Sequence, residues 1–306
     1  VPPIPGLADV PFHTNESIFD VDQTIDHLIV VGGGPIGLEM AQAHHRLGSR
    51  VTVVARSTIA SKDDTQLVEI LREQLLKEGV EIVEHAAIQS CAKSADGVAV
   101  SIAVDGATRE IAGSHLLVAT GRVPNIEELG LDAAGIDSSP AGITVDRGLR
   151  TSNKRAFAIG DVTGGPLFTH VAGYHAAVVI RRALFRTPAK IDHSAIPRVT
   201  YTDPELAQIG LTEDEAKAQN IKVKIVDWPL ADNDRAMAER IDHGLVKIIC
   251  APNGKILGAG LVGPGAGELM APFILAISQG MKIGAFVALI IPYPTLAEVP
   301  KRAAGS

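Results

Sequence analysis

Three glycines near the start of the chain have the spacing of a phosphate-binding loop. Gly32, Gly34 and Gly37 fit the pattern G-x-G-x-x-G, which follows the apolar run HLIVV and opens the helix-forming run PIGLEMAQAHHRLG. In such a loop the first glycine permits the tight turn, the second lets pyrophosphate approach the backbone, and the third lets helix and strand pack closely. The N–H groups and positive dipole at the helix start then hold phosphate. Because strand and helix flank the glycines, the pattern predicts dinucleotide binding.

The end of the next expected strand, RVTVVA, bears on which dinucleotide is bound. In an NAD-binding domain an acidic residue about 20 residues along accepts hydrogen bonds from the ribose 2′-OH. Ala55 takes that place here, Arg56 follows it, and Lys62 comes shortly after. A missing carboxylate and two cations suit a 2′-phosphate, so the sequence favours NADPH over NADH. The alternative is that Arg56 is an ordinary surface arginine.

A second candidate site follows the apolar run AFAIG, which we expect to be a buried strand. Gly160 and Asp161 stand at its carboxyl end, where open α/β sheets bind ligands. A helix is expected to begin near Thr169 and His170, with its positive end at the same edge. From these residues alone, Asp161 is either a ligand-holding carboxylate or a capping residue of a turn or helix.

The elements that must position these residues suggest an α/β protein. The order strand, helix, strand, helix, antiparallel insert and strand predicts a Rossmann-like NAD(P)-binding domain over residues 26–148. An α+β domain follows over 191–306. There we expect a helix opened by a Thr212 and Glu215 capping box, strands at 221–226, 245–250 and 256–262, and a helical stretch from about 266 to 290.

Composition excludes several kinds of partner. The net charge is −7 and no basic run exceeds the Arg181-Arg182 pair with Arg186, so nucleic acid is not expected as a partner. The apolar run FVALII at 286–291 is far shorter than the roughly 20 residues that span a bilayer, so no membrane association is expected. The chain opens VPPIPGL without an initiator methionine, which we interpret as a loop entered from an upstream segment, and hence as a fragment.

Cysteine and histidine usage points to a protein without a metal site. The two cysteines, Cys91 and Cys250, are far apart and lack C-x-x-C spacing, which favours free, buried thiols in a reducing compartment and a cytoplasmic location. The ten histidines are scattered, and the adjacent His44 and His45 cannot face one ion from the same helix. No metal ligand set is predicted.

Five segments in order give the chain a family resemblance: GGGPIGLE, VATGRVPN, AFAIGDVTGG, YTDPELAQIGLTEDEA and PYPTLAEVPKRAA. With these it resembles the pyridine-nucleotide–disulfide oxidoreductases, homodimeric flavoenzymes such as dihydrolipoamide dehydrogenase, glutathione reductase and mercuric reductase. The match runs from residue 1 to about 303. The resemblance implies homodimerisation through the 191–306 domain, and electron transfer from NAD(P)H through FAD to a small-molecule acceptor.

The same resemblance assigns the second candidate site to a flavin. In this family the Gly-Asp pair binds the ribityl chain of FAD, a role that falls on Gly160 and Asp161, and the helix at Thr169 and His170 points at the flavin ring. The family's flavin domain is split in sequence, and its first part carries another glycine loop and a C-x-x-x-x-C redox disulfide. Neither motif stands ahead of the nicotinamide domain in this chain. We therefore expect 1–25 and 149–190 to be the remnant of an FAD-binding domain, with FAD present in the full-length protein and absent from this chain.

Other positions of this sequence match residues that have defined roles in the family. Glu39 matches the glutamate beside the nicotinamide, which pairs with a lysine next to the disulfide, so Glu39 is expected to be unpaired here. Gly121 and Arg122 match a T-G-R turn beside the cofactors, although Arg122 could instead be a structural ion-pair partner. Pro35 stands where glutathione reductase has a tyrosine gate, so that gate is absent.

The segment YPTLAE at 293–298 matches a proton-transfer element of the family. Its first residue is histidine in dihydrolipoamide dehydrogenase and glutathione reductase, oriented by the glutamate at its end. Tyr293 replaces the histidine here and Glu298 is kept. With a reference pKa of about 10, against about 6.5 for histidine, a tyrosine cannot readily shuttle protons near neutral pH, yet it can donate a hydrogen bond. The alternative is a packing role for Tyr293 at the dimer interface.

Two functions remain open from the sequence. The first is the nicotinamide-binding and interface part of an NAD(P)H:acceptor oxidoreductase, inactive as this fragment alone. The second is a non-catalytic NAD(P)H-binding sensor or scaffold dimer that never carried a disulfide. A second glycine loop with C-x-x-x-x-C encoded upstream of Val1 would favour the enzyme, and the absence of both would favour the module.

Overall fold

The computed structural model describes residues 2–95 and 97–306, and the chain divides into two compact units. One unit joins Val1–Thr120 to Pro197–Ser306, and the other is Gly121–Ile196. Within the first unit we call residues 26–120 the nucleotide domain and 197–306 the interface domain. This division differs from the boundaries expected at 148/149 and 190/191, because 121–148 form their compact contacts with the residues that follow them.

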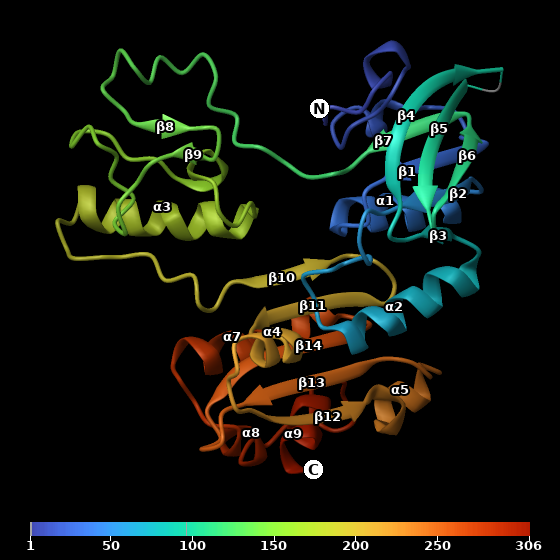
Figure 1. Cartoon of the computed structure of the whole chain (residues 1–306). Helices are drawn as coiled ribbons and strands as arrows, with labels where there is room; N and C mark the ends of the chain where they lie inside the picture. Colours follow the sequence, from blue (N-terminus) through green and yellow to red (C-terminus); the bar gives the residue numbers. More distant parts are fainter. Residues whose placement is uncertain (1, 96) are drawn as a thin grey trace. The chain divides into compact units, whose positions relative to one another are not determined.

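The nucleotide domain is built on a four-stranded parallel sheet in the order β3-β2-β1-β7. Two helices connect its first three strands (Figure 1). The elements are β1 (His27–Val31), α1 (Pro35–Arg46), β2 (Arg50–Val54), α2 (Thr65–Glu78), β3 (Glu81–Val83) and β7 (His115–Val118). Every residue of β1 is buried, as its run of apolar and β-branched side chains predicts for a central parallel strand.

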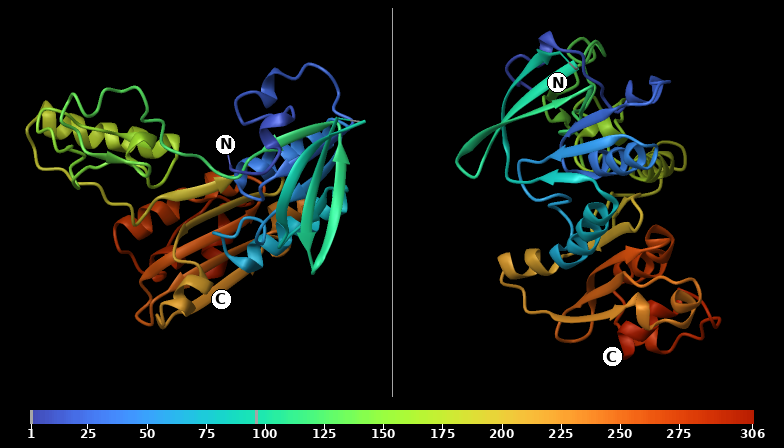
Figure 2. Two further views of the ribbon diagram at one scale, coloured as in Figure 1. Left: turned by 45° about the horizontal axis from the view of Figure 1, so that its top comes forward. Right: turned by 90° about the vertical axis from the view of Figure 1, so that its right-hand side faces the viewer.

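The helix α2 shows how local signals set an element's limits. Asp64 caps its start, with a carboxylate oxygen accepting from the Gln66 N–H at 3.1 Å. Gly79 ends it in the left-handed conformation at φ +108°. Between them Leu67, Leu71 and Leu75 form the buried stripe, and the helix packs between the parallel sheet of the nucleotide domain and the sheet of the interface domain (Figure 2). A Cβ atom on Gly260 would lie only 2.3 Å from Leu67 Cδ1, so a glycine is needed for this close approach.

An antiparallel insert separates β3 from β7. It consists of β4 (Ala87–Ser94), β5 (Gly97–Val104) and β6 (Ala107–Gly113). Residues 2–25, which we expect to belong to a flavin-domain remnant, contact this domain. Their 3₁₀ helices are η1 (Leu7–Asp9) and η2 (Ile18–Asp20). Cys91 N–H donates to Pro5 O at 2.8 Å, and His13 forms a bridge with Leu117.

The interface domain is a five-stranded antiparallel sheet in the order β10-β11-β14-β13-β12. Its strands are β10 (Pro197–Thr200), β11 (Glu205–Gly210), β12 (Lys224–Pro229), β13 (Leu245–Cys250) and β14 (Ile256–Gly263). Its helices are α4 (Glu213–Ala218), η4 (Leu230–Asp232), α5 (Asp234–Ala238), α6 (Ala266–Leu269), α7 (Ala271–Ser278), α8 (Gly284–Val287) and α9 (Glu298–Gly305). The capping box predicted at Thr212 and Glu215 is confirmed.

Two expectations for this domain were wrong in detail. The strand expected at 221–226 is displaced to β12, because Ile221 N–H bonds to Ala216 O at 2.9 Å and closes the end of α4. The single helical stretch expected from 266 to 290 is three short helices. Gly280 takes a left-handed φ of +62°, after which Met281 N–H returns to Ala276 O and the chain leaves α7.

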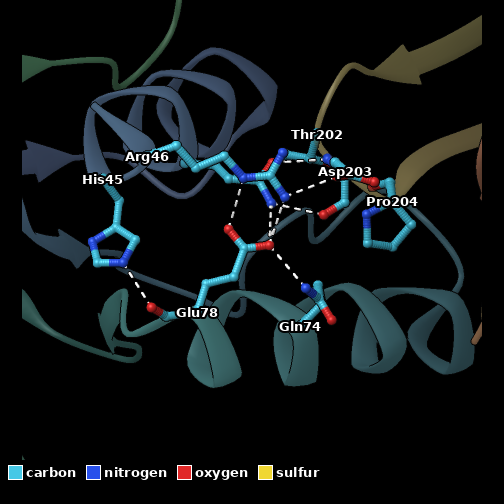
Figure 3. A network of polar contacts seen from close by, with 8 residues as sticks. His45, Arg46, Gln74, Glu78, Thr202, Asp203 and Pro204 are labelled. Atoms are coloured by element: carbon cyan, nitrogen blue, oxygen red, sulfur yellow. Dashed lines mark hydrogen bonds and ion pairs between the residues drawn. The ribbon is translucent and has the colours of Figure 1, made fainter. Parts of the chain in front are cut away.

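A polar network fastens the interface domain to α1 and α2 (Figure 3). Arg46 makes a bidentate pair with Glu78, at 2.9 Å and 2.7 Å, and its Nη2 reaches Asp203 Oδ2 at 2.9 Å. The Gln42 side chain exchanges two hydrogen bonds with the backbone of Asp203, at 2.7 Å and 2.8 Å. His45 and Gln74 add bonds to Glu78. The loop at Asp203 is therefore held against one face of α1.

The second unit, Gly121–Ile196, contains little regular structure. Its elements are β8 (Ser138–Ser139), β9 (Gly142–Ile143), η3 (Gly160–Thr163) and α3 (Thr169–Ala183). The helix begins at Thr169, as expected. The strand expected before Asp161 is replaced by an isolated bridge between Arg150 and Phe157, since within the described part of this unit no longer strand lies beside it to complete a ladder.

Both cysteines are free and buried, as predicted. Burial raises the pKa of each thiol, that of Cys250 to about 11, so neither is a ready nucleophile. Among the helices of residues 2–95 and 97–306, none is long and apolar enough to cross a membrane.

Candidate functional site

The glycine loop lies where β1 ends and α1 begins. Gly32 has φ +122°, and a Cβ atom there would lie 2.4 Å from Ala119 O. A Cβ on Gly37 would lie 2.0 Å from Gly32 O, whereas a Cβ on Gly34 would meet no protein atom within 4 Å. The fold itself therefore requires the first and third glycines. The second borders open space, where a ligand could approach the backbone.

The start of α1 is suited to an anion. Pro35 occupies the first turn and Gly34 is the N-cap, and no side chain caps the helix. The first N–H groups of a helix have no intrahelical acceptor, and the helix dipole places partial positive charge beside them. An arrangement of this kind can hold a pyrophosphate.

Glu39 lies one turn further along α1 and is half-buried. Its Oε1 accepts a hydrogen bond from the backbone N–H of Tyr201 at 2.9 Å. Burial raises the pKa of its carboxyl, and the Tyr201 hydrogen bond opposes the rise. Within the described residues Glu39 forms no ion pair, but its carboxylate is held by the loop of the interface domain rather than left without a partner.

The two cations predicted for the 2′-phosphate lie in the segment between β2 and α2. Ala55 is 2% exposed and offers no carboxylate, while Arg56 and Lys62 are both exposed. The backbone of Lys62 is fixed, because its carbonyl accepts from Arg198 Nη2 at 2.7 Å. Arg56 makes no ion pair within the described part of the chain, so its guanidinium is available to a ligand.

The second unit gathers the residues matched to the flavin. Asp161 lies on η3 and forms an ion pair with Arg122, Nη1 to Oδ2, at 3.5 Å. Arg122 also donates to Leu167 O. Gly121 has φ +143° and no neighbour within 4 Å of a would-be Cβ. The His170 ring stacks on Phe168 at the start of α3, with centroids 5.0 Å apart.

His175 also contacts this segment, and sequence reasoning missed it. Its ring is 2% exposed, and its Nδ1 accepts a hydrogen bond from Gly160 N–H at 3.1 Å. The proton of the neutral ring must then sit on Nε2, which lies 3.1 Å from His193 Nε2. Burial and, next, His193 lower the pKa of His175, which keeps Nδ1 free to accept. A histidine on α3 therefore fixes the backbone next to Asp161.

Tyr293 and Glu298 lie in the interface domain, on a different element from Glu39. Tyr293 is 68% exposed and its hydroxyl donates to Asp234 Oδ2 at 2.8 Å. That hydrogen bond and the Asp234 charge raise the phenol's pKa. Glu298 Oε2 instead accepts from Thr295 N–H at 3.3 Å. The group that orients Tyr293 is therefore Asp234, which sequence reasoning did not single out.

Within residues 2–95 and 97–306, no group of three or more His, Cys, Asp or Glu side chains could hold an ion.

Comparison with known families settles what kind of protein this is. A family model described as pyridine nucleotide-disulphide oxidoreductase matches residues 1–176. A second model, the dimerisation domain of the same family, matches residues 196–304. The chain belongs to the pyridine nucleotide-disulphide oxidoreductase family. The fold and family expected from the five sequence segments are confirmed.

Individual relatives agree with this placement. Mercuric reductase from Streptomyces lividans is 34% identical over 305 residues, which are 99% of this chain and 64% of that protein. Dihydrolipoyl dehydrogenase from Geobacillus stearothermophilus is 38% identical over 280 residues, 90% of this chain and 59% of that protein. A crystal structure of LpdA from Mycobacterium tuberculosis superposes with a TM-score of 0.87 at 32% identity, covering 95% of this chain and 64% of that one. The chain thus spans roughly half to two thirds of the length of these family members.

Proposed function

We propose that this chain is the NAD(P)H-binding and dimerisation part of a flavoprotein NAD(P)H:acceptor oxidoreductase. The observation that carries the proposal is the glycine loop, whose second glycine borders open space at the uncapped start of α1. We infer that pyrophosphate binds there, with Glu39 beside the nicotinamide. The match of 196–304 to the dimerisation domain supports a homodimer, and the two buried, free thiols support a cytoplasmic location.

For the full-length protein we infer that FAD lies between the nicotinamide and a small-molecule acceptor. Gly160, Asp161 and the start of α3 at Thr169 and His170 would meet the flavin. Gly121 and Arg122 belong to the same proposed site, because Arg122 pairs with Asp161. The flavin would supply the step between hydride transfer from the nicotinamide and electron delivery to the acceptor. The Arg122 pair with Asp161 orients the carboxylate and neutralises part of its charge.

The nucleotide preference gives the first test of this proposal. Arg56→Ala is expected to weaken NADPH binding to the 306-residue chain by about 1.5–3 kcal/mol, because one charged hydrogen-bonding partner of the 2′-phosphate is lost. NADH, which lacks that phosphate, should bind with unchanged affinity. Calorimetric titration of both nucleotides measures the two dissociation constants.

The matched control is Lys222→Ala, which removes another exposed cation from the interface domain. It should leave both affinities unchanged. Equal affinities of the wild-type chain for NADPH and NADH, or no effect of Arg56→Ala on NADPH, would overturn the assignment of the 2′-phosphate to Arg56. Binding of neither nucleotide would overturn the proposed function itself.

Tyr293 gives a second test, in the full-length protein. We expect that protein to reduce lipoamide or glutathione disulfide poorly, with kcat/KM about 10²–10⁴-fold below that of a relative with histidine at this position. The phenol is not an acid–base group near neutral pH, and its proton is engaged by Asp234. Steady-state kinetics with each disulfide, for wild type and Tyr293→Phe, measures this. Efficient turnover that survives Tyr293→Phe would contradict both the acceptor class and the role of Tyr293.

A further inference from the structure

The segment that follows β2 is held at both of its ends. At the start, Ala55 N–H donates to Val83 O at 2.8 Å, and Ala55 O accepts from Ala86 N–H at 3.0 Å. At the far end, Ala60 N–H donates to Gly33 O at 2.8 Å, inside the glycine loop. The geometry of this segment is therefore tied directly to the pyrophosphate loop.

The buried anchor in the middle of the segment is Ile59. Its side chain is fully buried and packs against Gly33, where a Cβ would come within 3.0 Å of Ile59 Cγ2. Its backbone N–H donates to Glu84 Oε1 at 2.6 Å. Arg56, Ser57 and Thr58 are the residues left between the anchors, and all three are exposed. We call these three residues the arch.

The carboxylate that anchors Ile59 carries its own counter-charge. Arg72, on α2, donates from Nη2 to the same Glu84 Oε1 at 2.9 Å, and also contacts Glu69. The side chains of Arg72 and Glu84 are only 17% and 20% exposed, so their pairing is not a loose surface contact. An acid at the end of β3 thus stands beside the arch without presenting a free negative charge.

We propose that Glu84, neutralised by Arg72, is a positioning residue that holds the arch as the cradle for the 2′-phosphate of NADPH. This inference rests on the proposed NADPH site and names the residues that determine its specificity. The arch offers one guanidinium and two hydroxyls, the groups that bind phosphate oxygens in proteins. Holding the arch in place before binding lowers the entropy lost when the phosphate is captured. Arg72 prevents Glu84 from repelling that phosphate.

The experiment measures dissociation constants for NADPH and NADH with the 306-residue chain, three test variants and one control variant. Glu84→Ala removes the acceptor of the Ile59 N–H. It should weaken the binding of NADPH about tenfold, while the affinity for NADH changes less than about twofold. Glu84→Gln keeps an acceptor oxygen for the Ile59 N–H, so this variant should bind NADPH in preference to NADH as the wild-type chain does. Arg72→Met leaves the Glu84 carboxylate without its cation beside the phosphate. This variant should weaken the binding of NADPH more than the binding of NADH. Glu81→Ala is the control, since this carboxylate on β3 has Thr52 and Arg109 as partners.

The NADH affinity shows in each case whether the variant is folded. If Glu84→Ala binds NADH normally and keeps the full preference for NADPH, the positioning role is overturned while the proposed Arg56 contact stands. If Glu84→Ala binds neither nucleotide, the Arg72→Met variant provides the test. An unchanged preference of Arg72→Met for NADPH over NADH then overturns the inference. Equal affinities of the wild-type chain for the two nucleotides would overturn this inference together with the Arg56 assignment.

Discussion

Replacing Lys247 with alanine is expected to lower the free energy of unfolding by about 3–5 kcal/mol, because it leaves the buried carboxylate of Asp64 without a counter-charge. Lys247 lies on β13 with its side chain 4% exposed. Its Nζ contacts Asp64 Oδ1 at 3.0 Å and Glu213 Oε2 at 2.6 Å, and the Asp64 side chain is 2% exposed. Without the ammonium, the hydrogen bonds left to the Asp64 carboxylate within the described residues come from the backbone N–H groups of Gln66 and Glu213, which do not cancel its charge.

Glu213, which contacts Lys247, also pairs with a second lysine that supplies a matched control. Lys217 pairs with the other oxygen of Glu213, at 2.7 Å, but its side chain is largely exposed. An exposed pair of this kind is screened by solvent, so Lys217→Ala should change stability little. Urea denaturation of both variants at one protein concentration measures the difference. Similar small effects of Lys247→Ala and Lys217→Ala would show that the buried cluster does not hold the domains together.

The Lys247 cluster also explains why the nucleotide and interface domains form one unit. Asp64 is the N-cap of α2, so the ammonium on the interface sheet holds the start of that helix. The Glu78 network holds its end, through Arg46 and the loop at Asp203 (Figure 3). The helix that follows the arch is therefore fixed at both ends by contacts between the two domains.

The elements that the sequence predicted well are those whose signals are local. The strands of the nucleotide sheet are continuous apolar runs, and α2 carries its own cap and glycine stop. The elements it missed depend on distant contacts. No periodicity within residues 1–25 foretells that Pro5 accepts from Cys91 or that His13 pairs with Leu117. The expected helix through residue 290 failed because Ile256 N–H captures Met281 O after the glycine at 280.

Site residues divide in the same way. The glycines, Arg56 and Asp161 stand in short motifs whose meaning is carried by immediate neighbours. Glu84, His175 and Asp234 gain their importance only from partners that are 25, 15 and 59 residues away. A carboxylate or imidazole in an ordinary strand or helix gives no sequence signal for such a contact. The supporting residues therefore had to come from the structure.

Gly34→Ala is expected to abolish most nucleotide binding without disturbing the fold. A Cβ at this position meets no protein atom within 4 Å, so the free protein has room for it. In the proposed complex that methyl group would occupy the space through which the pyrophosphate reaches the start of α1. Displacing the pyrophosphate from this position would remove at least two charge-assisted hydrogen bonds. That loss is about 3 kcal/mol, or roughly a hundredfold in affinity. NADPH and NADH share the pyrophosphate, so both should be affected alike.

Gly37→Ala is the comparison that separates ligand exclusion from misfolding. Its Cβ would lie 2.0 Å from Gly32 O, so this variant must distort the turn or the helix even without ligand. We expect Gly37→Ala to lower both the melting temperature and the affinity, and Gly34→Ala to lower the affinity alone. Thermal unfolding and calorimetric titration on both variants measure the two effects independently. A Gly34→Ala chain that binds NADPH as tightly as wild type would place the pyrophosphate elsewhere, because no bound phosphate could then lie against that backbone.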